Sequence, residues 1–152
     1  MIPRRMPEFH AEMVEAFMAS SNRMTGLPEF LGLRIVAMEP GGLTAEMAVD
    51  PKLLTGFGNM HGGVLSAACD HVLGCVCYPH MEKGQWAATT EFKINLLAPA
   101  QGDYLEAVGT VVRSGRTLTI CQLEVFGVTE QGRAQVALGQ QTLICLQGKQ
   151  DR

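Results

Sequence analysis

The chain has 152 residues, of which 47% are hydrophobic, and its formal net charge is −3. This length and apolar content suit one compact domain with a sizeable core, and a second domain would not fit comfortably. The charge offers no broad basic surface for nucleic acid, so an anionic ligand would need a local cluster of donors. No apolar run approaches the roughly 20 residues that span a bilayer, so we expect no membrane segment.

The cysteines and the start of the chain indicate a soluble, cytoplasmic protein. The five cysteines are an odd number, lack paired C-x-x-C spacing and fall in apolar segments. They are therefore predicted to be reduced packing residues, with neither a disulfide framework nor a metal site. The first residues, MIPRRMPEFHAEMVEAF, lack the unbroken apolar segment of a secretion signal.

The first half of the chain predicts two helices with a hairpin between them. Residues 7–26 carry apolar side chains at mixed spacings of four and one, which indicates a short amphipathic helix that serves as an edge element or lid. Two apolar runs flank a turn at residues 39–42 and predict a β-hairpin. Residues 61–78 are rich in Ala, Leu and Val and stop before Pro79, which predicts one long buried helix.

The second half predicts an antiparallel meander. A two-residue period starts at Trp86, and further strands are expected at about 103–113, 116–128 and 133–146. One face of the first strand should hold Trp86, Ala88, Thr90, Phe92, Ile94 and Leu96. Its wetter face should hold Thr89, Glu91, Lys93 and Asn95. The sequence thus predicts an α+β domain over residues 27–147, with an N-terminal helix and lead-in at 1–26 and a tail at 148–152.

Residues 61–74, HGGVLSAACDHVLG, begin with two glycines at the expected start of the buried helix. The first turn of a helix has backbone N–H groups without partners and the positive end of the macrodipole. Gly62 and Gly63 would let a carbonyl approach this backbone closely. Such an oxyanion hole contributes about 3 kcal/mol to a transition state per donor. The alternative is that the glycines only permit tight packing.

Asp70 lies among apolar residues of the same helix, where a carboxylate is costly to bury without compensation. It follows Gly62 by eight residues, which is about 12 Å along a helix. The two groups therefore cannot easily serve one carbonyl within one chain. The simplest shared site is a two-fold dimer in which Asp70 of one subunit faces the Gly62 amide of the other. The alternative is a structural carboxylate, hydrogen-bonded to nearby backbone or to His71.

A turn at residues 113–117 is the second candidate for ligand binding. Arg113 and Arg116 supply two cations there, and Gly115 and Thr117 add backbone donors suited to phosphates outside a pocket. Two solvated arginines at a hairpin turn are the alternative. The nine methionines would either line a pliable apolar pocket or belong to the core.

The stretch HGGVLSAACD, followed by TTEFKINLLAPA and by VVRSGRTL before a final pair of strands, resembles the hotdog-fold acyl-CoA thioesterases of the phenylacetic-acid-degradation (PaaI-like) type. The resemblance extends from about residue 27 to 146. It implies an antiparallel β-sheet wrapped around one long central helix, in homodimers joined edge to edge that often pair into homotetramers. It also implies hydrolysis of aryl or medium-chain acyl-CoA thioesters, with coenzyme A as part of the substrate and no cofactor.

The resemblance also implies roles for single residues. The amide of Gly62 would polarise the thioester carbonyl, and Asp70 would act as nucleophile or as the general base that activates water. Thr89 would help to place the water or the carboxylate. His61 corresponds to a histidine that holds the loop, for which a structural role is expected.

One position departs from the family pattern. Six residues before the histidine the family commonly has Asn or Gln, whereas this chain has Thr55. A hydroxyl can still donate a hydrogen bond, with shorter reach, and Asn59 is a candidate substitute. The departure leaves open a non-catalytic acyl-CoA binding or sensing protein, against which Asp70 argues.

Two other enzyme classes fit less well. A hydratase or dehydratase that acts on acyl thioesters would use His61 as its acid–base group. The FPG-type motif that accompanies the histidine in the acyl-carrier dehydratases is absent from this sequence. A Ser-His-Asp hydrolase would need a G-x-S-x-G elbow, which the sequence lacks. Thioester hydrolysis needs only a positioned water or carboxylate and stabilisation of the oxyanion, so it remains the favoured reaction.

Overall fold

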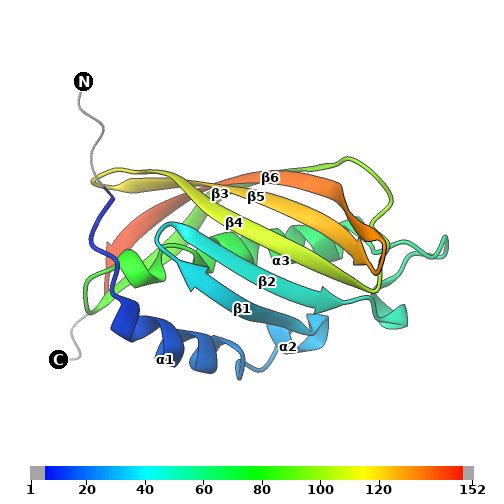
Figure 1. Cartoon of the computed structure of the whole chain (residues 1–152). Helices are drawn as coiled ribbons and strands as arrows, with labels where there is room; N and C mark the ends of the chain where they lie inside the picture. The colour runs from blue at the N-terminus through cyan, green and yellow to red at the C-terminus, as the bar shows by residue number, and fades with distance from the viewer. Residues whose placement is uncertain (1–5, 149–152) are drawn as a thin grey trace.

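A six-stranded antiparallel sheet curves around one helix in the computed structural model, which describes residues 6–148 (Figure 1). The order across the sheet is β1-β2-β4-β5-β6-β3. The strands are β1 (Leu33–Glu39), β2 (Gly42–Ala48), β3 (Gln85–Leu96), β4 (Tyr104–Ser114), β5 (Leu118–Thr129) and β6 (Gly132–Gln147). The helices are α1 (Ala11–Ser21), α2 (Leu27–Leu31) and α3 (Gly62–Cys75), with 3-10 turns η1 (Pro51–Leu53) and η2 (Tyr78–His80).

The central helix α3 packs an apolar face on the concave side of the sheet. Leu65, Cys69, Val72 and Leu73 are each at most 2% exposed and form the middle of the core. The helix is shorter than predicted, because it ends at Cys75 and the chain then enters η2. Pro79 has no N–H to continue the helical hydrogen bonds but is tolerated in the first turn of a helix, so the last residues form a separate 3-10 turn with Pro79 near its start.

The predicted hairpin is confirmed, and strand ends lie within two residues of the expected ones. The predicted meander is confirmed for β4, β5 and β6, whereas β3 pairs with β6 at the edge of the sheet and not with β4, the next strand in sequence. In the β1–β2 turn, Gly41 has φ of 72°, a left-handed conformation that favours glycine. The N-terminal helix is also confirmed but ends at Ser21, several residues before the expected end near Gly26. Its end is held by Asn22, whose side chain bonds both the N–H and the C=O of Ile35 at 2.8 Å.

The side chains of strand β3 do not follow the predicted alternation between the two faces of the sheet. A bulge between Thr89 and Glu91 shifts its register against β6. Before the bulge, the side chain of Thr89 faces α3, and after it Leu96 does, where it meets the start of that helix at Gly62. A continuous period of two assigned Thr89 and Leu96 to opposite faces. The extra residue at the bulge brings them to the same face.

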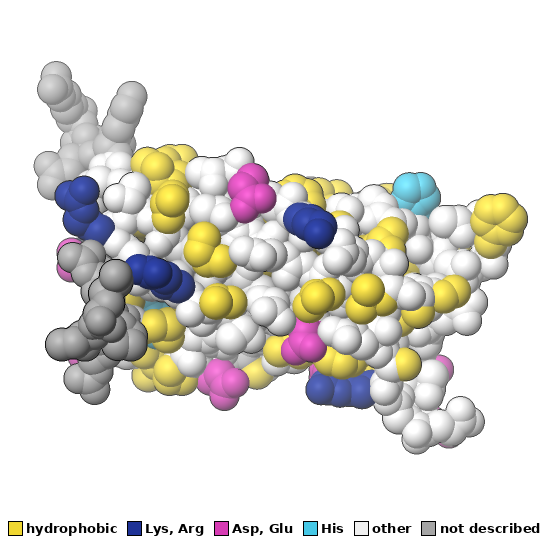
Figure 2. All heavy atoms as spheres, turned by 90° about the horizontal axis from the view of Figure 1, so that it is seen from above, with side chains coloured by type: hydrophobic (Ala, Val, Ile, Leu, Met, Phe, Trp, Pro, Cys, Tyr) yellow, Lys and Arg dark blue, Asp and Glu magenta, His cyan; other side chains and the backbone are white. Residues whose placement is uncertain are grey.

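The α+β class with an antiparallel sheet around a long helix is confirmed. Of the predicted lead-in and tail, residues 1–5 and 149–152 lie outside the described part of the chain. No helix within residues 6–148 has both the length and the apolar character needed to cross a membrane. The face above the sheet carries scattered hydrophobic side chains, with charged side chains of both signs between them (Figure 2).

Candidate active site

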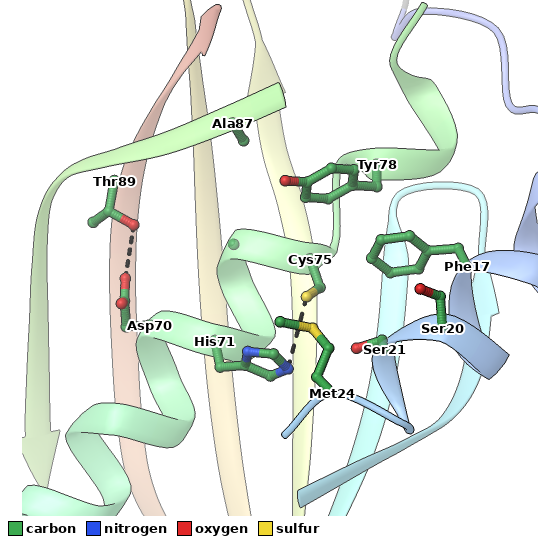
Figure 3. Close-up of a pocket in the computed structure, with 11 residues that line it drawn as sticks. Phe17, Ser20, Ser21, Met24, Asp70, His71, Cys75, Tyr78, Ala87 and Thr89 are labelled. Carbon is green, nitrogen blue, oxygen red and sulfur yellow. Dashed lines mark hydrogen bonds between the residues drawn. The ribbon is translucent and has the colours of Figure 1, made fainter. Parts of the chain in front are cut away.

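Asp70 is the centre of a three-residue hydrogen-bonded cluster on the concave side of the sheet. The Thr89 hydroxyl donates to Oδ1 of Asp70 at 2.7 Å (Figure 3). The Gln141 amide nitrogen lies 3.0 Å from the same oxygen and 2.5 Å from the Thr89 hydroxyl. Helix α3, strand β3 and strand β6 thus each contribute one side chain. Within residues 6–148, the Asp70 carboxylate bonds these two side chains and neither backbone nor His71, the partners that the structural alternative supposed.

Gln141 is the residue of this cluster that sequence reasoning missed. It is fully buried, and its Oε1 has no hydrogen-bond partner in the described part of the chain. A signal was present, because β6 places Ala137, Gly139 and Leu143 in the same buried series. A polar side chain in an inward-facing apolar series calls for a partner inside the fold.

The start of α3 offers one free backbone donor. The Gly63 N–H donates to Nδ1 of His61 at 2.9 Å, so His61 caps the helix and occupies one of the two predicted donors. The Gly62 N–H has no hydrogen-bond partner among residues 6–148. The Ser66 hydroxyl bonds the Gly62 carbonyl at 2.9 Å, within the first turn. Gly62 and Asp70 lie on the same continuous helix, as predicted, so about 12 Å of helix separates them.

Thr55 and Asn59 belong to a tight loop that precedes α3. The Thr55 hydroxyl accepts from the Phe57 N–H at 3.3 Å, and the Thr55 N–H donates to the Asn59 carbonyl at 2.7 Å. Oδ1 of Asn59 accepts from the Gln101 amide at 2.6 Å. Both side chains therefore hold the loop, and neither contacts Asp70 within the described residues.

The turn at residues 113–117 lies on a different part of the sheet. Thr89 pairs with Leu143, which pairs with Thr119, which pairs with Ser114 beside the turn. These three strand spacings amount to about 14 Å. Arg113 and Arg116 are exposed, and the Gly115 N–H closes the turn on the Leu118 carbonyl at 2.8 Å. The carbonyl of Thr117 accepts from the Cys145 N–H at 3.2 Å.

A pocket of about 280 Å³ opens beside Asp70 (Figure 3). Its lining comes from α1, α3, η2 and β3 and comprises Phe17, Ser20, Ser21, Met24, Asp70, His71, Gly74, Cys75, Tyr78, Ala87 and Thr89. Burial lowers the pKa of His71, while the charge of Asp70 acts in the opposite direction. Burial raises the pKa of the Cys75 thiol to about 12, so this cysteine is not a thiolate nucleophile.

All five cysteines are free, as predicted. Cys69, next to Asp70 in sequence, also has a pKa raised to about 12, chiefly by burial. Within residues 6–148, no group of three or more His, Cys, Asp or Glu side chains is placed to hold a metal ion. The groups that the described residues supply are a hydrogen-bonded carboxylate, a helix N-terminus and a pocket.

A sheet wrapped around a long central helix is the hotdog fold, and here a carboxylate from that helix lies beside a pocket. The sequence model of the Thioesterase superfamily matches residues 57–134, about half of the chain. The chain belongs to this family and is a thioester hydrolase. The predicted PaaI-like hotdog architecture is confirmed.

Three relatives illustrate the match. The 1,4-dihydroxy-2-naphthoyl-CoA hydrolase of Listeria monocytogenes is 26% identical over 106 residues, which cover 70% of this chain and 86% of that protein. A thioesterase family protein from Silicibacter pomeroyi has a TM-score of 0.81 and 29% identity, covering 91% of this chain and 99% of that one. The PaaI protein of E. coli shares the fold, with a TM-score of 0.78 at 24% identity over 91% of this chain and 97% of that one.

Proposed function

We propose that the protein hydrolyses aryl or medium-chain acyl-CoA thioesters to the free acid and coenzyme A, with Asp70 as the reacting carboxylate. The hydrogen bonds of Asp70 carry this proposal. Thr89 and Gln141 both bond Oδ1, whereas Oδ2 receives no hydrogen bond from the described residues. One oxygen is thus fixed, and the other is free to react beside the pocket.

The reaction needs a base or nucleophile and a donor for the oxyanion. As a base, Asp70 takes a proton from a water whose oxygen bonds to the thioester carbonyl carbon. The carbonyl oxygen becomes an oxyanion and accepts a hydrogen bond from the Gly62 N–H. The position of this N–H at the start of the helix stabilises negative charge. Collapse breaks the C–S bond, and the coenzyme A thiolate leaves and is protonated. As a nucleophile, Asp70 instead forms an acyl anhydride that water then hydrolyses.

The two groups would meet in a homodimer. Strand β3 is an edge of the sheet and exposes Trp86, Phe92 and Leu96, which favours pairing with a second edge. A β-carbon built on Gly62 would lie 2.8 Å from the Leu96 side chain, so the free Gly62 amide lies beside the end of β3. Asp70 lies beside Thr89, nearer the start of the same strand. Antiparallel pairing of two β3 strands, centred between Thr89 and Leu96, brings Gly62 of one subunit to Asp70 of the other.

The coenzyme A part of the substrate would lie along the surface. We assign its phosphates to Arg113 and Arg116, because both side chains are exposed and lie close together in sequence at the end of β4 and in the turn after it, although the Gly115 N–H of this turn is occupied by the Leu118 carbonyl. A homotetramer, in which such dimers pair, stays part of the proposal. The fold supplies the acyl pocket and the turn separately, so acyl selection and nucleotide binding involve different residues.

The test is release of free thiol from a panel of acyl-CoA thioesters by the wild type and by Asp70→Asn. This nearly isosteric change should reduce kcat at least about a hundredfold with folding intact. Asp103→Asn, at an exposed loop position, is the matched control and should retain full activity. Wild-type turnover in Asp70→Asn would remove Asp70 from the chemistry, and acyl-CoA binding without thiol release would show a binding protein.

A further inference from the structure

The far wall of the acyl pocket comes from a helix outside the part of the chain that matches the family. Phe17, Ser20 and Ser21 of α1 line the pocket, and Met24 follows just after the helix. The family match begins only at residue 57. Figure 3 shows Asp70 on one side of the pocket and the α1 residues on the other. The wall opposite the reacting carboxylate is therefore formed by the N-terminal helix α1 and by Met24 just after it.

Helix α1 is fastened at both ends, so it is a fixed wall. After its C-terminus, Asn22 bonds both backbone groups of Ile35 in β1. Before its N-terminus, the His10 N–H donates to the Pro79 carbonyl at 2.8 Å. The His80 ring also lies 2.9 Å from the Pro7 carbonyl through Nδ1. These bonds link α1 to β1 and to η2.

The aromatic ring of Phe17 is held against η2. It stacks on Tyr78 with ring centroids 4.9 Å apart and an interplanar angle of 21°. Both rings line the pocket and both are half-buried. Stacking stabilises the two rings in contact with each other, so a substrate displaces them less readily than it would a single flexible side chain. The pair therefore forms a firm end to the pocket.

We propose that α1 sets the largest acyl group that the enzyme accepts, with Phe17 as the specificity-determining residue. The inference rests on the proposed function, because the acyl carbonyl must start at Asp70. From Asp70 to Cys75 the pocket follows five residues of α3, about 7.5 Å of helix. Its volume of about 280 Å³ is at the small end of ligand pockets. An acyl group of one aromatic ring or a short to medium chain fits, and a long chain meets Phe17.

The experiment compares kcat/KM for butanoyl-, benzoyl-, phenylacetyl- and hexadecanoyl-CoA. The wild type should favour the three compact substrates. Phe17→Ala should raise the ratio of hexadecanoyl to butanoyl kcat/KM at least about tenfold, because discrimination of this size is typical of apolar pockets. Met13→Ala is the matched control, since Met13 is an exposed residue of α1 that does not line the pocket. It should leave the ratio unchanged.

A second variant works in the opposite direction and protects the test against a folding defect. Ser20 is an exposed residue of α1 that lines the pocket, so Ser20→Leu should fold and narrow the space. It should lower phenylacetyl turnover relative to butanoyl turnover. Unchanged ratios in both folded variants would overturn the role of α1 while leaving thioester hydrolysis in place. A wild type that releases thiol from no acyl-CoA would overturn the proposed function and this inference together.

Discussion

The amide of Gln141 donates to the same carboxylate oxygen of Asp70 that already accepts a hydrogen bond from strand β3. Gln141 comes from a different strand and is fully buried, so it fixes the carboxylate from the core side. The arrangement has a cost, because Oε1 of Gln141 finds no partner among the described residues. An unsatisfied buried acceptor typically costs about 1–3 kcal/mol. Such a cost indicates a role in function more than in stability.

Gln141→Met should therefore separate activity from stability. The change removes the donor to Asp70, and hydrogen bonds to charged groups contribute about 1.5–3 kcal/mol, so kcat should fall at least about tenfold. It also removes the unsatisfied Oε1, so the free energy of unfolding should stay equal or rise by about 1 kcal/mol. Steady-state kinetics and urea unfolding measure the two effects on the same preparation.

Gln140→Met is the matched control for this prediction. Gln140 is the neighbouring residue of β6, but its side chain is exposed on the other face of the sheet. Its replacement should change neither kcat nor stability by a measurable amount. A Gln141→Met protein that loses stability and activity in parallel would mean that Gln141 is a structural residue only.

The backbone amide of Gly62 can be removed almost alone. Gly62 is the first residue of α3, a position that proline favours, and His61 before it has φ of −66° and ψ of 135°, which suits a residue preceding proline. Gly62→Pro should thus keep the helix while deleting the N–H. We expect kcat to fall about a hundredfold or more, as for the loss of one oxyanion donor.

Gly62→Ala is the control, because its added β-carbon also meets Leu96 but the N–H remains. Most of the activity should survive in it. Mixing inactive Gly62→Pro subunits with inactive Asp70→Asn subunits should then restore part of the activity, because one site of each mixed dimer has both intact groups. Mixed dimers that are shown to form by mass spectrometry yet stay inactive would contradict the shared site.

The fold was predictable from the sequence wherever the residues of one strand, helix or turn are sufficient to set its structure. The hairpin turn at Gly41 and the run of α3 are examples, since turn chemistry and apolar periodicity act within a few residues. Two features depend on distant partners and were missed. The bulge of β3 exists only in its pairing with β6, and the end of α1 is set by Asn22 bonding to Ile35.

The candidate site also has parts that local sequence predicts and parts that depend on residues distant in sequence. The Gly62 start of α3 and the spacing to Asp70 were visible because both lie on one helix. The link from Asp70 to Gln141 crosses 71 residues of sequence, and no local pattern connects them. Thr89 was proposed from family resemblance, whereas the alternation of β3 taken alone assigned it to the wrong face. The bulge between Thr89 and Glu91 explains why the alternation failed at Thr89.

The two exposed arginines of the β4–β5 turn should matter only for substrates that carry the nucleotide. Replacing Arg113 and Arg116 by Ala should raise KM for coenzyme A thioesters, while KM for short thioesters that lack the nucleotide stays the same. The kcat should change little with either substrate, because the turn lies about 14 Å across the sheet from Thr89. Equal effects on both substrates would show that the turn is structural.

The buried thiols should make the protein lose stability in alkaline solution. Burial raises the pKa of Cys69 and Cys121 from 9.0 to about 12. Above pH 9 the unfolded chain releases these protons and the folded chain keeps them, so stability falls as pH rises toward 12. Each thiol contributes at most about 1.4 kcal/mol per pH unit. Urea unfolding of the reduced protein at several pH values between 7 and 11 measures the slope.

Cys121→Val tests whether a single thiol accounts for its share of that slope. Cys121 is fully buried in β5, so the variant should show a shallower loss of stability above pH 9 than the wild type. Cys145→Val is the comparison, because Cys145 is only half-buried and its pKa is raised by a weaker burial. It should flatten the slope less. If both variants kept the wild-type slope, other groups would have to cause the alkaline loss, and the cysteines would not titrate with unfolding.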